Sequence, residues 1–194
     1  MTNPSQRIVL LTLLMLPVIV FAHVESGLSG GGFFTGMMHP VTGLDHVIAM
    51  VAVGLWGAQL GLPALWVLPV AFPLVMALGG AAGAMGLGLP GVEIGIALSG
   101  VFLGAMVLFN IRMQLWLALI PVSIFAIFHG HAHGTEMPNM AVPLLYASGF
   151  VIATGLLHLS GIAIGTLWKW PTGQWIVRGA GGVIAALGAY FLFV

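Results

Sequence analysis

The segment AVPLLYASGFVIATGLLHLSGIAIG, residues 141–165, decides the structural class of this protein. It contains no Asp, Glu, Lys or Arg, and about 20 apolar residues are enough for a helix to cross the hydrocarbon core of a bilayer. The rest of the chain is similar: 60% of its 194 residues are hydrophobic, 4% are charged and the mean hydropathy is +1.17. Soluble domains carry about 25% charged residues. The sequence therefore predicts an all-α, polytopic membrane protein that contacts lipid.

Six apolar segments are long enough, or nearly so, to be transmembrane helices. They cover residues 37–60, 64–88, 92–109, 113–130, 141–165 and 175–193. The connections between them are short, so we expect sequential helices to pack as antiparallel neighbours in a single domain, residues 23–194. Glycines recur four residues apart in several of these segments, which permits close helix contacts. These pairs are Gly57/Gly61, Gly79/Gly83, Gly100/Gly104 and Gly161/Gly165.

The N-terminal residues 1–22 have the features of a cleavable signal peptide. Arg7 precedes the apolar stretch Ile8–Val20, and small residues suited to cleavage end at Ala22. The stretch is short for a membrane span, which favours cleavage after Ala22. The alternative is an uncleaved first membrane helix.

The few charged residues predict an orientation. If the mature N-terminus is periplasmic, every basic residue falls on the cytoplasmic side, as the positive-inside rule requires. These residues are Arg7, Arg112, Lys169 and Arg178, whereas Glu25, Glu93 and Glu136 fall on the other side. We therefore expect a multi-pass protein of the bacterial inner membrane. The formal net charge of zero argues against nucleic-acid binding.

Polar residues interrupt the first mature span in the block HPVTGLDH, residues 39–46. Ionisable groups within a span usually face a cavity or a partner. On a continuous helix, with Pro40 in its first turn, His39 and His46 would share one face and Asp45 would lie about 100° to the side. Imidazole and carboxylate groups are ligands for Ni, Co or Zn. Asp45 either binds the metal or orients a ligating histidine; the simpler alternative is a polar pair that holds helices together.

A second histidine cluster is FHGHAHGTE, residues 128–136. His129 and His133 are four residues apart, a spacing by which one helix face can bind a metal. Glu136 shares that face if the helix continues past Gly134. His131 points to the opposite side and fits a supporting or entry role. The alternative is a histidine-rich outer loop that binds metal loosely.

Two other histidines are candidates for the metal path. His158 is the only ionisable residue in its span, about 25 Å from the outer end by helix rise. That depth suits an inner site or an exit relay, and a histidine bonded to a backbone carbonyl is the alternative. His23 would become the N-terminal residue after cleavage, where its amine and imidazole could chelate one cation together.

These motifs resemble those of the HupE/UreJ family of bacterial nickel permeases. The resemblance is carried by H-P-x-x-G-x-D-H at residues 39–46, H-G-x-A-H-G-x-E at 129–136 and A-T-G-x-x-H at 153–158, and it extends over nearly the whole mature chain. It implies a cleaved signal peptide, about six helices, and nickel supply for hydrogenase or urease maturation. The resemblance implies that the metal-path residues are His39, Asp45, His46, His129, His133 and Glu136.

We therefore expect an uptake permease for a transition-metal dication, with Ni²⁺ first and Co²⁺ or Zn²⁺ next, rather than an enzyme. The metal would be the transported substrate, and no catalytic cofactor is expected. A homo-oligomer is possible. Two alternatives remain from other classes: an integral-membrane zinc-dependent hydrolase, for which the sequence has no HExxH motif, and a metal-binding assembly subunit without transport.

Overall fold

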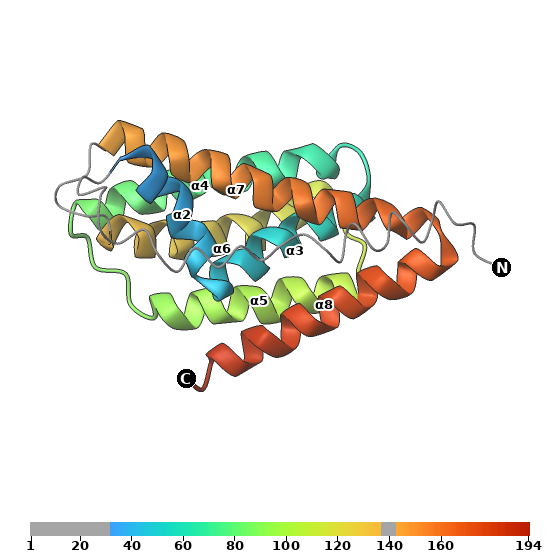
Figure 1. Cartoon of the computed structure of the whole chain (residues 1–194). Coiled ribbons are helices and arrows are strands. Elements are labelled where there is room, and N and C mark those ends of the chain that lie inside the picture. Colours follow the sequence, from blue (N-terminus) through green and yellow to red (C-terminus); the bar gives the residue numbers. More distant parts are fainter. Residues whose placement is uncertain (1–31, 137–142) are drawn as a thin grey trace.

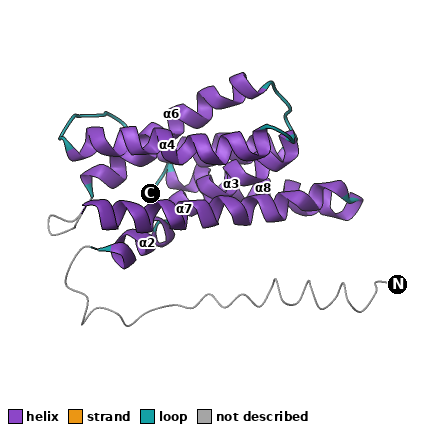
Figure 2. Cartoon of the chain, turned by 90° about the horizontal axis from the view of Figure 1, so that it is seen from above, coloured by secondary structure: helices purple, strands orange, loops and turns teal. Residues whose placement is uncertain are grey.

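The computed structural model describes residues 32–136 and 143–194, and every regular element in these two ranges is helical (Figures 1 and 2). The structure therefore confirms the all-α prediction for this part of the chain. The predicted signal peptide, residues 1–22, and the candidate ligand His23 lie outside the described residues.

The helices follow one another with short connections. They are α2 (Phe33–Thr42), α3 (Leu44–Leu60), α4 (Ala64–Ala84), α5 (Val92–Leu108), α6 (Leu115–Thr135), α7 (Pro143–Gly165), the 3₁₀ helix η1 (Thr166–Lys169) and α8 (Pro171–Phe191). All six predicted apolar segments are thus helical. The second cluster extends α6 beyond its predicted end, because Gly134 does not terminate the helix.

Not all of these helices are equally suited to cross a membrane. By length and hydropathy α4, α6 and the continuous segment Leu144–Lys169 each qualify, and the pair α2–α3 would be a fourth span. Helix α5 is apolar but has only 17 residues. Helix α8 has 21 residues but carries Gln174 and Arg178, which lower its hydropathy. The sequence predicted six membrane spans. Among the described residues three helices meet the criteria for a span, or four if the bent pair counts as one.

The continuous helix predicted for residues 37–60 is wrong, because the chain bends by 85° between α2 and α3. Gly43 at the junction has an extended backbone. Pro40 lies inside α2 rather than in the first turn of a helix. The new helix is stabilised at its start by Asp45, whose Oδ1 accepts the backbone N–H of His46 at 3.0 Å and whose charge suits a helix N-terminus. Because of this bend, His39 lies on α2 and His46 lies on α3, and the two histidines do not share the face of one helix.

The closest helix pairs are not sequential, which corrects the prediction of antiparallel sequential neighbours. Helix α4 packs most closely on α6, α5 on α8, and α3 on α7. Glycines explain this pairing, since they let backbones touch. A Cβ on Gly130 would meet the Met76 carbonyl oxygen of α4, and one on Gly134 would meet that of Gly80. Gly130 and Gly134 thus allow close backbone contact between α6 and α4. The His129 and His133 rings contact His46 of α3.

Helix α3 lies at the centre of the bundle, with Met50, Val53 and Trp56 fully buried. Arg112 lies in the α5–α6 connection, Lys169 in η1 and Arg178 in the first half of α8. In Figure 1 these segments lie at the right, at the end of the bundle opposite α2. There Arg178 donates its Nε–H to the Leu108 carbonyl at 2.8 Å, at the C-terminal end of α5. The acidic and basic ends of the molecule are therefore separated along the helices.

Candidate metal-binding site

A cavity of about 240 Å³ opens at the end of the bundle where α2 meets α3 and α6 ends. We call it the vestibule. It is lined by His39, Thr42, Gly43, Asp45, His46, Glu93, His133 and Glu136. Every carboxylate residue of the described ranges lines this one cavity, and neither lysine nor arginine does. The vestibule is therefore suited to attract cations.

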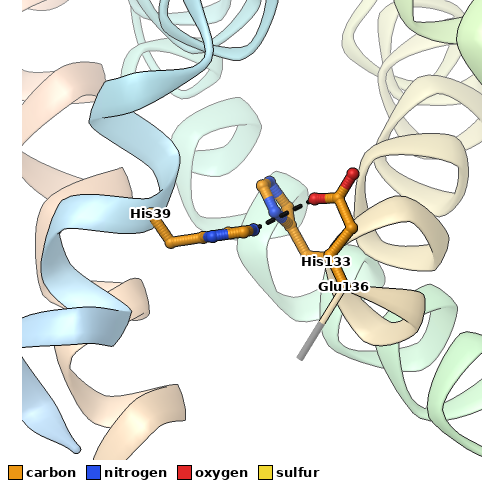
Figure 3. A group of neighbouring side chains, drawn as sticks. All are labelled: His39, His133 and Glu136. Carbon is orange, nitrogen blue, oxygen red and sulfur yellow. Dashed lines mark hydrogen bonds and ion pairs between the residues drawn. The ribbon is translucent and has the colours of Figure 1, made fainter. Parts of the chain in front are cut away.

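Three side chains at the mouth of the vestibule can share one metal ion. Donor atoms of His39, His133 and Glu136 all lie within 4.8 Å of one another. The His39 Nε2 and the Glu136 Oε2 are 3.1 Å apart, so this pair joins α2 to the end of α6 (Figure 3). Two imidazoles and a carboxylate form a donor set that Ni²⁺, Co²⁺ or Zn²⁺ accepts.

Deeper in the vestibule, His46 is held in position by its neighbour. The His46 Nδ1 donates to the Asp45 Oδ1 at 2.9 Å, which leaves the buried Nε2 without a protein partner in the described structure. A carboxylate that orients a histidine in this way is common around metal-binding imidazoles. Of the two roles expected for Asp45, the geometry therefore matches the orienting one.

His129 is oriented in a similar way by the backbone. Its Nδ1 donates to the Phe125 carbonyl one turn earlier, at 2.8 Å. The Nε2 is buried and has no partner among the described residues, so its lone pair is free to bind a cation. His129 itself is completely buried, and it therefore extends the site inward from the vestibule.

His133 lies at the centre of the cluster. Its ring centroid is 4.8 Å from that of His39 and 4.3 Å from that of His46. On the remaining side the Phe150 ring of α7 lies 4.5 Å away. Neither ring nitrogen of His133 has a hydrogen-bond partner in the described residues. Buried polar atoms are normally paired, so these nitrogens fit a role as donors to a metal.

The four imidazoles form a continuous row, which we call the histidine row: His39, His133, His46 and His129. Its members are joined by ring contacts of 4.3 to 4.9 Å. The His39 side chain is 23% exposed, whereas His133 and His46 are buried, with 6% and 8% of each residue exposed, and His129 is fully buried. The row therefore leads from the surface into the core.

The two other described candidates lie outside this row. His131 points away, as expected from its place in the motif, and its Nε2 donates to the Leu87 carbonyl in the α4–α5 connection at 2.6 Å. His158 does not reach the vestibule. It is 1% exposed, and its ring contacts Phe72 of α4 instead of the histidine row.

Sequence reasoning did not place Glu93 or Thr42 in the site. Glu93 lies in the first turn of α5 and had been used only as an indicator of orientation. The positive-inside analysis placed Glu93 and Glu136 on the same side of the membrane, and this was the one sequence feature that could have suggested a shared site. Glu93 and Glu136 line the same cavity because α5 packs beside α3 and α6. No local sequence motif specifies this packing.

The bundle and its acidic, imidazole-lined vestibule define an integral membrane protein with a candidate cation-binding site. The chain belongs to the HupE/UreJ family, whose pattern matches residues 11–191; this is a transporter-type family associated with nickel and cobalt. It is 46% identical to Protein HupE from Rhizobium leguminosarum bv. viciae over 182 residues, which cover 94% of each chain. No solved structure matches it significantly.

Proposed function

We propose that this protein is an uptake permease for Ni²⁺, with Co²⁺ as the next substrate, that moves the cation from the periplasm to the cytoplasm. The cation would serve hydrogenase or urease maturation. One observation carries the proposal: the carboxylates of the described residues gather in one vestibule, and the histidine row leads inward from it.

The two kinds of side chain have different tasks in this mechanism. Asp45, Glu93 and Glu136 concentrate cations and offset the double positive charge, which is costly to bring into a bundle of low dielectric. The imidazoles replace water molecules of the hydration shell. Borderline nitrogen ligands favour Ni²⁺, Co²⁺ and Zn²⁺, whereas Mg²⁺ and Ca²⁺ prefer oxygen ligands. The row therefore selects the transition-metal ions.

Inward movement needs no nucleotide. A dication gains about 4.6 kcal/mol for each 100 mV of inward-negative potential. Capture must remain moderate in affinity, because a site that binds too tightly does not release its ion. Several neighbouring imidazoles meet this requirement, since a cation can exchange one donor at a time along the row.

The test is uptake of radiolabelled Ni²⁺ at trace concentration into cells that lack their own nickel importers. Four strains are compared at equal membrane levels of protein: empty vector, wild type, His46→Ala and His131→Ala. We expect uptake by the wild type and by His131→Ala, whose imidazole faces away from the row. His46→Ala should fall to the vector level.

Competition by unlabelled Co²⁺, Zn²⁺ and Mn²⁺ then ranks the substrates. Nickel-dependent hydrogenase or urease activity in the same strains at limiting nickel tests the destination of the metal. Equal accumulation in all four strains would refute nickel uptake. Uptake that survives His46→Ala but is lost in His131→Ala would refute the role of the histidine row.

A further inference from the structure

The histidine row ends against an aromatic side chain. The Phe72 ring of α4 lies 5.5 Å from the His129 ring on one side and 5.4 Å from the His158 ring on the other. Phe72 is completely buried. Within the described residues no direct ring contact joins His129 to His158. The Phe72 ring therefore lies between the two imidazoles and contacts both.

Beyond Phe72 the interior is polar again. His158 is 1% exposed. The Thr154 backbone carbonyl, one turn earlier, is an acceptor for one of its ring nitrogens, and the other nitrogen has no partner in the described structure. Thr154, one turn earlier on α7, is fully buried and its Oγ1 has no partner there either. Unpaired polar groups in a core are unusual. Two of them one helical turn apart mark a place that can accept a cation.

We propose that Phe72 is an apolar barrier between the histidine row and an inner cation position at His158, and that this barrier contributes to metal selectivity; the role in selectivity rests on the proposed function. A dry apolar constriction excludes ions that keep their hydration shell. A cation that has exchanged water for imidazole at His129 can transfer to the imidazole of His158. Mg²⁺, which dehydrates reluctantly and prefers oxygen ligands, cannot.

The α4 backbone around Phe72 is missing two helical hydrogen bonds. Pro69 and Pro73 both lie inside α4, and neither has an N–H to donate. The Leu65 and Pro69 carbonyls therefore lack their usual helical donors. Proline is a common site of bending in membrane helices. The turn that carries Phe72 can thus shift its ring without unfolding α4.

The first test measures the barrier without any metal. The protein has no cysteine, so His158→Cys introduces a single thiol that a charged, membrane-impermeant methanethiosulfonate reagent can label. In oriented membrane vesicles, a separate Thr42→Cys variant identifies the side on which the vestibule opens. We expect His158→Cys to resist labelling from that side, and the double variant with Phe72→Ala to be labelled at least tenfold faster. Leu68→Ala, an equally buried change on α4, is the matched control and should leave the thiol protected.

The outcomes separate clearly. Fast labelling of His158→Cys with Phe72 intact would overturn the barrier, and so would continued protection after Phe72→Ala. If the alanine variant does not reach the membrane, Phe72→Val opens a smaller gap and is subject to the same criteria. Because labelling needs no transport, the barrier is tested even if nickel uptake fails.

The second test measures selectivity in proteoliposomes. For wild type, Phe72→Leu and Phe72→Ala, the ratio of Ni²⁺ to Mg²⁺ influx is determined at equal protein content. An apolar leucine should keep the ratio within about twofold of wild type, and alanine should lower it at least tenfold by admitting Mg²⁺. An unchanged ratio in Phe72→Ala would overturn the role in selectivity. Absence of Ni²⁺ influx in the wild type would instead refute the proposed function.

Discussion

The replacement of Glu93 by Gln tests the electrostatic part of the site most directly. Glu93 lines the vestibule but does not belong to the group of His39, His133 and Glu136 that can share one ion. It therefore acts on a bound cation through its charge. Glutamine keeps the size and the hydrogen-bonding capacity of the side chain and removes only the charge.

The magnitude follows from the size of the cavity. A sphere of about 240 Å³ has a radius of about 4 Å, so a dication at its centre lies about 5 Å from a carboxylate oxygen at the wall. In a water-like dielectric, charges of 2+ and 1− at that distance attract by about 1.7 kcal/mol. Glu93 is exposed, which justifies the water-like value. We therefore expect Glu93→Gln to weaken Ni²⁺ binding about 15-fold.

The assay is Ni²⁺ binding to purified protein in detergent, measured by competition with a chromogenic chelator at about 10 mM and at about 1 M salt. The Debye length falls from about 30 Å to about 3 Å between these conditions, so the difference between variant and wild type should nearly vanish at high salt. Thr42→Val, a neutral change in the same cavity, is the control. Equal affinities of Glu93→Gln and wild type at low salt would refute the electrostatic role of the vestibule.

Three other predictions rest on matched comparisons. His133→Ala should weaken Ni²⁺ binding at least tenfold in the chelator assay, because it removes a central donor, whereas His131→Ala should change it less than threefold. Gly130→Ala should lower the free energy of unfolding by about 1–3 kcal/mol through overlap with the α4 backbone, whereas Gly155→Ala, with open space around its Cα, should be neutral or stabilising; urea unfolding in detergent distinguishes them. Arg178→Met should cost about 0.5–1.5 kcal/mol by removing the hydrogen bond at the end of α5, and an unchanged thermal midpoint would contradict it.

The first motif illustrates how far sequence reasoning reached. The residue types predicted a metal-binding region, and the structure places His39, Asp45 and His46 around one cavity. The reason given, a shared face of one continuous helix, is wrong, because the chain bends by 85° between α2 and α3. The direction of the chain at this extended glycine depends on how both flanking helices pack, and that packing involves residues distant in sequence.

The second motif was predicted more fully because its geometry is local. His129, His133 and Glu136 lie within two turns of a regular helix, and helical periodicity alone places them on one side. Periodicity also placed His131 on the other side, and the structure gives it a carbonyl partner in the α4–α5 connection. The additional role of Gly130 and Gly134, contact with the α4 backbone, required knowledge of the helix pairs.

The sequence by itself determined that this chain is a membrane-embedded helical bundle with ionisable residues concentrated in a few segments, because hydropathy and helical periodicity are local properties. Tertiary structure alone decided which of these residues meet. Contacts between nonsequential helices, set by the positions of small residues, brought Glu93 into the vestibule and placed Phe72 between His129 and His158. The distances between donor groups are therefore a property of the packed helices and cannot be derived from any single segment.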